Sequence, residues 1–109
     1  MTARAFFDPL RSVVFGDISA VYASVGVVFG HEVREFRLIN NTEGDMIFTD
    51  DITIAAGKWF IPKGTFLLVD VQSNGRSRDD KFVVAKGTQI SVKQVTAPSS
   101  GGVYVEALY

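Results

Sequence analysis

Residues 38–51, LINNTEGDMIFTDD, place a polar turn between two short apolar runs, with two acidic residues in the turn and two more after the second run. Before the turn, the apolar residues Phe36 and Leu38 alternate with charged ones, as expected of a strand that buries one face. Met46 and Phe48 repeat this alternation after the turn. The intervening Asn, Gly and Asp residues tolerate left-handed backbone or hydrogen-bond within their own turn. The stretch therefore predicts a β-hairpin.

The rest of the chain shows the same succession of short apolar runs and turn residues, without helical periodicity. The run TFLLVDV at 65–71 is apolar on both faces near its middle, which is typical of a central strand. Clear alternation predicts two more strands at 88–95 and 102–109, and weaker patterns stand at 12–16, 25–29, 58–61 and 81–85. About eight strands at this spacing predict an all-β fold, a single-domain antiparallel sandwich that is jelly-roll-like.

Length and composition predict one soluble domain spanning 1–109. The chain has 109 residues, and 47% of them are hydrophobic, which is enough for a real core. The net charge of −1 provides no basic field, so we expect no nucleic-acid partner. Cysteine is absent, which excludes disulfides and thiolate metal sites. No apolar segment is long enough to predict a membrane span or a secretory signal, so a soluble intracellular product is expected.

The candidates for chemistry are few. The acids that bracket the polar turn, Glu43, Asp45, Asp50 and Asp51, carry oxygens that a hard cation prefers. Their spacing does not follow an EF-hand loop, and solvated turn ends are the stronger interpretation. His31 is the only histidine, and no catalytic motif accompanies it. The sequence therefore predicts no catalytic residue, no metal site and no cofactor, and a protein that is not an enzyme.

Several aromatic side chains are candidates for a contact surface. Trp59 and Phe60 are neighbours on one expected strand, so one ring should face inward and the other outward. The leading segment, residues 1–10, has the character of an arm that reaches an adjacent subunit. Aromatic anchors dominate interface energetics. The interface residues expected from this pattern are Phe6, Phe7, Leu10, Trp59, Tyr104 and Tyr109. Exposed rings of this kind also stack on sugars in carbohydrate-binding modules.

Five stretches carry a resemblance to a known group of proteins. They are FFDPLRSVVFGDIS (6–19), REFRLINNTEGDMIFTDD (34–51), FIPKGTFLLVDVQSN (60–74), GTQISVKQ (87–94) and GGVYVEALY (101–109). In this order they resemble short virion structural proteins of tailed bacteriophages, particularly short-tailed ones. The shared pattern is an apolar strand ending in Asn-Asn-Thr, a strand bearing Phe, an apolar-Pro-x-Gly turn, a strand ending in Asp, and a closing Val-Tyr strand. The chain departs from this pattern at Asp50-Asp51-Ile52, where the continuation of the predicted hairpin is more apolar than in the group.

The resemblance implies a β-sandwich subunit present in many copies per particle, at the head-to-tail junction, in the tail or on the capsid exterior. Its partners would be other copies of itself and other virion proteins. It would be located in the virion, which is assembled in the host cytoplasm. Two alternatives remain open. One is a capsid decoration or cement protein. The other is a small carbohydrate-binding module that binds host glycans in a shallow groove lined by Trp59 or the tyrosines.

Overall fold

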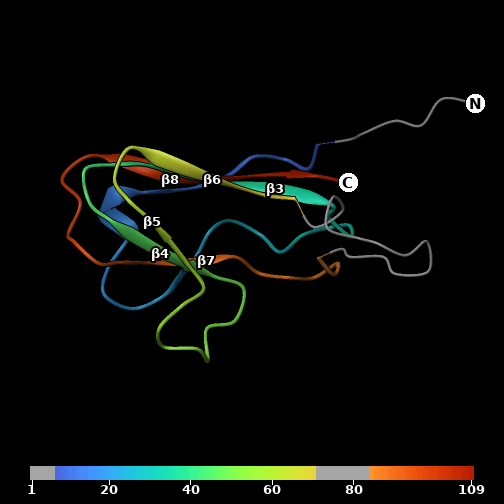
Figure 1. Cartoon of the computed structure of the whole chain (residues 1–109), viewed down its shortest axis with the longest axis horizontal. Coiled ribbons are helices and arrows are strands. Elements are labelled where there is room, and N and C mark those ends of the chain that lie inside the picture. Colours follow the sequence, from blue (N-terminus) through green and yellow to red (C-terminus); the bar gives the residue numbers. More distant parts are fainter. Residues whose placement is uncertain (1–6, 71–83) are drawn as a thin grey trace, which may run out of the picture.

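The structure is a computed structural model, and it describes residues 7–70 and 84–109 (Figure 1). The regular secondary structure of the described residues is almost entirely β-strand, as the sequence predicts. The elements are β1 (Arg11–Val14), the 3-10 helix η1 (Phe15–Asp17), β2 (Ala23–Ser24), β3 (Glu35–Thr42), β4 (Met46–Thr49), β5 (Trp59–Ile61), β6 (Thr65–Asp70), β7 (Ser91–Gln94) and β8 (Gly101–Leu108). In these two ranges, no helix has the length and apolar character needed to cross a membrane.

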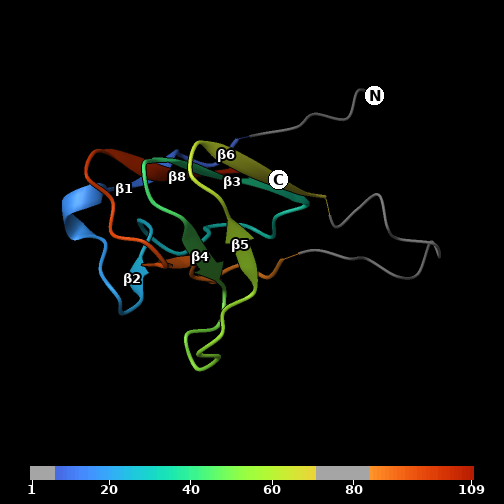
Figure 2. The same cartoon turned by 60° about the vertical axis from the view of Figure 1, so that its left-hand side comes forward.

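The strands form two four-stranded antiparallel sheets that stack on each other (Figures 1 and 2). The order is β1-β8-β3-β6 in the first sheet and β2-β7-β4-β5 in the second. The first four strands pair with the last four in reverse order: β1 with β8, β2 with β7, β3 with β6, and β4 with β5. A two-stranded ribbon wrapped in this way around a core is a jelly roll. The expected jelly-roll-like sandwich of about eight strands is thus confirmed.

The core lies between the two sheets and is built from alternate residues of the strands. The expected inward positions are buried: Phe36 and Leu38 on β3, Met46 and Phe48 on β4, Ile90 and Val92 around β7, and Val103, Val105 and Ala107 on β8. Each buried side chain of the size of Val, Leu or Phe contributes about 1.5–3 kcal/mol relative to its exposed state. The hydrophobic interior that results from period-two alternation therefore holds the sheets together.

The polar turn within 38–51 does not form the predicted hairpin. β3 pairs with β6 and β8 in the first sheet, whereas β4 pairs with β5 and β7 in the second. The turn therefore carries the chain across the core, from one sheet to the other. The hairpin prediction was wrong because both strands point their apolar faces at the same core from opposite sides, so they cannot lie side by side in one sheet.

A buried asparagine stabilises this crossing. Asn40 Nδ2 donates to the carbonyl oxygens of Gly44 (2.8 Å) and Ile61 (2.9 Å), and its Oδ1 accepts the backbone N–H of Thr42 (3.1 Å). The side chain has no exposed surface, and its amide is paired with backbone groups of the turn and of β5, as a buried amide requires. A Cβ on residue 44 would overlap the carbonyl oxygen of Thr96, so glycine is required there.

Two further expectations need correction. β6 is not a central strand, because among the described residues it pairs with β3 alone and lies at the edge of the first sheet. Residues 25–29 form no strand; the strand of this region is β2, and Val25 and Phe29 enter the core from a loop. Of the weak pattern at 81–85, residues 81–83 lie outside the described residues, and Val84 forms one bridge to Val33.

Candidate interaction surface

β6 presents the longest sheet edge in the described part of the chain. It has six residues, whereas the other outer strands, β1, β2 and β5, have four, two and three. It carries no charge from Thr65 to Val69, and its Phe66 and Leu68 are 59% and 51% exposed. A long apolar edge strand offers backbone hydrogen-bonding groups to another chain. β6 is therefore a candidate contact element.

The outer face of the first sheet continues this apolar surface across the neighbouring strands. In one row of the register, Phe66 of β6 lies opposite Ile39 of β3, which lies opposite Tyr104 of β8. In the next row, Leu68 lies opposite Arg37, which lies opposite Glu106. Directly opposite side chains on one sheet face are in contact range. The outer face thus combines apolar side chains with one pair of opposite charges.

A groove of about 380 Å³ lies on this outer face. Phe66 and Leu68 line it on the β6 side, and Leu108 lines it on the β8 side together with Phe7, which forms a bridge to Leu108. Phe7 is 76% exposed. The charged residues of the groove come from β3 and β8, between the apolar walls. Such a mixture of apolar walls and a few polar groups is typical of binding sites.

Arg37 and Glu106 form an ion pair inside the groove, with Arg37 Nε 2.6 Å from Glu106 Oε1. The Arg37 guanidinium also lies over the ring of Phe66, 5.2 Å from its centroid. Both charged side chains are about 40% exposed (41% and 39%), so the pair contributes about 0–1 kcal/mol to stability. Its main effect is to hold Arg37 against Phe66 and so fix the shape of the groove.

The outer face of the second sheet is partly covered by the chain itself, although Phe60 remains 55% exposed there. The loop between β4 and β5 folds back over it, and Tyr22 Oη donates to the carbonyl oxygen of Ile54 (2.9 Å). The Lys93 ammonium donates to the carbonyl oxygen of Ala55 and lies 4.7 Å from the centroid of the Tyr22 ring. Gly57 packs directly on Ile47, which points outward from β4. The first sheet is distinguished from it by its longer edge strand and by the groove.

A buried ion pair anchors the segment that precedes β1. Arg11 Nη2 lies 3.1 Å from Asp8 Oδ2, and His31 Nδ1 lies 3.1 Å from Asp8 Oδ1. An ionised carboxylate only accepts hydrogen bonds, so Nδ1 of His31 carries the proton. Burial raises the pKa of the Asp8 carboxyl, but hydrogen bonds from His31 and Arg11 and the Arg11 charge lower it more, so its pKa lies below the ordinary 3.8. Asp8 and Arg11 thus fix Phe7 beside the groove.

Of the expected interface residues, only some lie at the groove or on its sheet face. Phe7 lines the groove, and Tyr104 lies on the same outer face but does not line it. Leu10 is 60% exposed but does not line the groove. Tyr109 stacks on His31, with ring centroids 3.7 Å apart. Phe6 lies outside the described residues.

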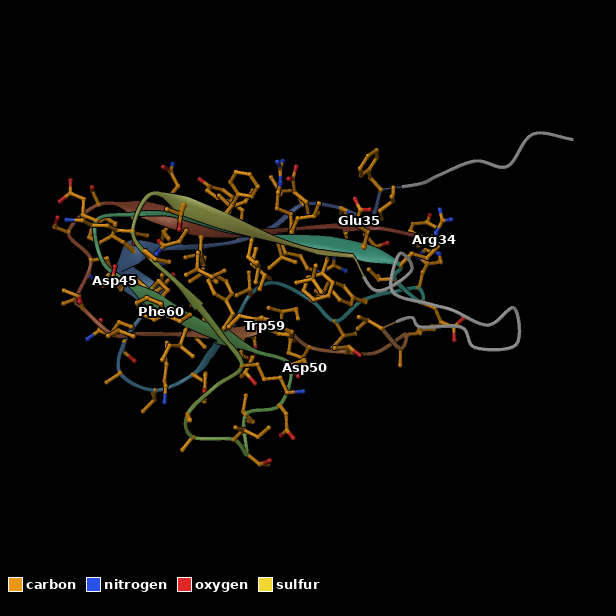
Figure 3. The ribbon with its side chains drawn as sticks, viewed as in Figure 1. Arg34, Glu35, Asp45, Asp50, Trp59 and Phe60 are labelled. Carbon is orange, nitrogen blue, oxygen red and sulfur yellow. The ribbon has the colours of Figure 1, made fainter. Side chains whose placement is uncertain are left out.

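Trp59 belongs to the core side of its strand. Its ring meets Phe36 edge to face, and it packs against the buried core, whereas its neighbour Phe60 is 55% exposed (Figure 3). One ring inward and one outward is what the sequence predicts, and the inward one is Trp59. Trp59 does not line the groove of the first sheet, so it is not part of this contact surface.

The acids that bracket the polar turn are engaged locally. Each carboxylate has its own hydrogen-bond or ion-pair partner: Ser99 and Ser100 for Glu43, the backbone N–H of Lys63 for Asp45, Lys58 for Asp50, and Thr53 for Asp51. In residues 7–70 and 84–109, no group of three metal-ligating side chains is present. These carboxylates therefore bind groups of the protein itself.

The sequence-based reasoning missed four of the residues that shape the groove, namely Glu35, Arg37, Phe66 and Leu68. The signal for Phe66 and Leu68 was present, since apolar residues on both faces of a strand fit an exposed edge at a contact as well as a central strand. Comparison of the chain with protein-family models, with curated proteins and with solved structures found no match. The function proposed for this surface therefore rests on its residues and geometry and on the resemblance described above.

Proposed function

We propose that this chain is a non-enzymatic structural subunit of a bacteriophage virion, a component of the head-to-tail junction or the tail. It acts through contacts with copies of itself and with other virion proteins, after assembly in the host cytoplasm. Two things support this proposal. The five stretches quoted above resemble short virion structural proteins, and the jelly roll is a fold of viral capsid proteins, although a fold alone does not define a function.

The observation that carries the proposal is the uncovered apolar edge and face of the first sheet. Phe7, Phe66 and Leu68 are each more than half exposed, and β6 leaves one side without a strand neighbour among the described residues. An exposed apolar edge of this length is an aggregation hazard in a free monomer. The hazard disappears when the edge is covered by another subunit, which is the working state of a virion component.

The size of the apolar contribution favours assembly in many copies over an isolated pair. Covering Phe7, Phe66 and Leu68 would contribute on the order of 4 kcal/mol, given about 1.5–3 kcal/mol for each fully exposed side chain. Association costs about 4–15 kcal/mol in lost freedom. One such contact alone is therefore weak, whereas repetition around a ring multiplies its effect through avidity.

The proposal is tested by the behaviour of the full chain in solution and in particles. We expect concentration-dependent oligomers in sedimentation velocity, and weaker association for Phe66→Lys, because a lysine on β6 opposes edge pairing. Phe60→Lys is the matched control, since Phe60 is similarly exposed on the second sheet. Cryo-electron microscopy of the virions should show the chain in a repeated ring. A chain that stays monomeric at every concentration and is absent from purified virions would refute the proposal.

A further inference from the structure

Glu35 is a carboxylate without a cationic partner in the groove. It is half-buried, lines the groove, and has no hydrogen bond or ion pair in the part of the chain that the structure describes. Figure 3 shows it on the outer side of the first sheet, away from the second. The nearby cation, Arg37, is already paired with Glu106. The residues opposite Glu35 in the register are Asp70 on β6 and Leu108 on β8, and neither residue type is a cation.

The surroundings of Glu35 suit a cation attached to an apolar chain. Phe7, Phe66 and Leu68 line the same groove, and aromatic rings and a carboxylate together attract a guanidinium or ammonium group. The volume of about 380 Å³ is near the lower end of the ~300–1,000 Å³ range of ligand sites. A groove of this size holds a few side chains of an extended segment, not the face of a folded domain.

Residues 1–6 of this chain, Met1-Thr2-Ala3-Arg4-Ala5-Phe6, have the matching chemistry. Arg4 is their only charged side chain, and Arg pairs with carboxylates in a bidentate geometry. Phe6 stands two positions later, so in an extended segment it shares a face with Arg4, about 7 Å along the backbone. Outward residues of β3, such as Glu35 and Arg37, repeat at the same spacing. Arg4 and Phe6 therefore fit the carboxylate and the apolar wall together.

The direction of the chain at Phe7 favours a second copy as the source of this segment. Phe7 lies antiparallel to Leu108, and the backbone N–H of Asp8 donates to the carbonyl oxygen of Ala107 (2.9 Å). At Phe7 and Asp8 the chain therefore runs antiparallel to β8, with its N-terminal direction pointing past the C-terminal end of that strand. Residues 1–6 of the same chain would have to reverse direction just before Phe7, which itself lines the groove.

We infer that the groove on the outer face of the first sheet binds residues 1–6 of a second copy of this chain, with Arg4 paired with Glu35. This inference deepens the structural role proposed above and rests on it. It turns a general apolar surface into a directional contact, in which each subunit offers a segment to one neighbour and a groove to the other. Such a head-to-tail contact closes into a ring or continues as a filament.

Charge reversal of the full-length chain tests the pairing. The variants are Glu35→Arg, Arg4→Glu and the double variant, and the association constant is measured by sedimentation velocity. Each single reversal should weaken association about tenfold or more, because it places like charges in the contact, and the double reversal should restore it. Asp17→Arg and Lys86→Glu are matched controls on exposed positions away from the groove, and they should leave association unchanged. Trp59 fluorescence, which reports on the core, verifies that every variant is folded.

Mixing the two single variants distinguishes a second copy from the same chain. In the mixture, the acidic segment of the Arg4→Glu chain meets the basic groove of the Glu35→Arg chain. The unaltered Arg4 of the second chain likewise meets the unaltered Glu35 of the first. Mixing alone therefore restores a contact between copies. If the segment binds its own groove, mixing restores nothing, and the inference is wrong. The inference is also wrong if Glu35→Arg weakens association but Arg4→Glu does not. It is wrong as well if both single variants associate as strongly as the wild-type chain. Wild-type chains that never associate would instead contradict the structural role itself.

Discussion

Phe36 of β3 and Trp59 of β5 meet edge to face across the interior, with ring centroids 5.6 Å apart. Phe36 belongs to the first sheet and Trp59 to the second, so the contact joins the two layers. The neighbours of Phe36 on β3, Glu35 and Arg37, line the outer groove, so the core lies directly beneath the candidate contact surface. Packing inside the sandwich and the shape of the groove are therefore linked through one strand.

Replacement of Phe36 by alanine should destabilise the domain strongly. The side chain is buried, and the loss of a buried phenyl ring costs about 3–5 kcal/mol, including the cavity that remains. Urea unfolding followed by Trp59 fluorescence measures the loss, and the native emission should also shift to the red. Phe60→Ala is the control, because its ring is largely exposed and should cost less than about 1 kcal/mol. Equal losses for the two variants would contradict the placement of Phe36 between the sheets.

Replacement of Asn40 by aspartate should destabilise the crossing between the sheets although the side chain keeps its size. Aspartate lacks the Nδ2 donors, so the carbonyl oxygens of Gly44 and Ile61 lose their partner, at about 1–3 kcal/mol each. Denaturant unfolding should show a loss of at least about 2 kcal/mol. Asn41→Asp is the matched control, since Asn41 is exposed on the same strand and should change little. A loss of the same size at Asn41 would show that charge, not the missing donors, is responsible.

Acid should weaken the domain through Asp8. The pKa of Asp8 is lower in the folded than in the unfolded state, so its contribution is fully present above about pH 4 and is lost as the pH falls through the folded-state pKa. Thermal unfolding between about pH 7 and pH 2 should therefore show a falling Tm below about pH 4. Asp8→Asn should flatten this dependence. The pKa values of Glu43 and Asp51 are also lowered, by hydrogen bonds from Ser99 and from Thr53 respectively, so a smaller slope should remain. An unchanged slope in Asp8→Asn would exclude Asp8 as the main acid-sensitive group.

Two truncations should separate folding from assembly. Deletion of residues 1–6 should leave the free energy of unfolding nearly unchanged, because it keeps the anchoring contacts of Phe7 and Asp8. Deletion of residues 1–10 removes Asp8 and leaves the buried Arg11 without its carboxylate, which costs about 3–5 kcal/mol. Urea unfolding measures both. Similar stability of the two truncated chains would mean that the Asp8–Arg11 pair does not hold this segment in place.

The sequence determined the local features of this protein. Alternation placed Val103, Val105 and Ala107 inward and Tyr104 outward, because successive side chains of a strand point to opposite faces. The sequence Lys-Gly-Thr occurs twice, at 63–65 and 86–88, and both copies form turns with a positive φ at the glycine, 70° at Gly64 and 89° at Gly87. Such features depend on a few adjacent residues, so the printed sequence is sufficient to predict them.

Only the tertiary structure decided which strands are neighbours. The turn after β3 has the residues of a hairpin, yet it crosses between sheets, because its strands have their partners far away in the sequence and Asn40 reaches the carbonyl oxygen of Ile61. The same long-range pairing puts β6 at an edge and assembles the groove from β3, β6, β8 and Phe7. Pairing is set by the joint burial of both apolar faces, a property of the whole chain, whereas alternation and turn chemistry are set residue by residue.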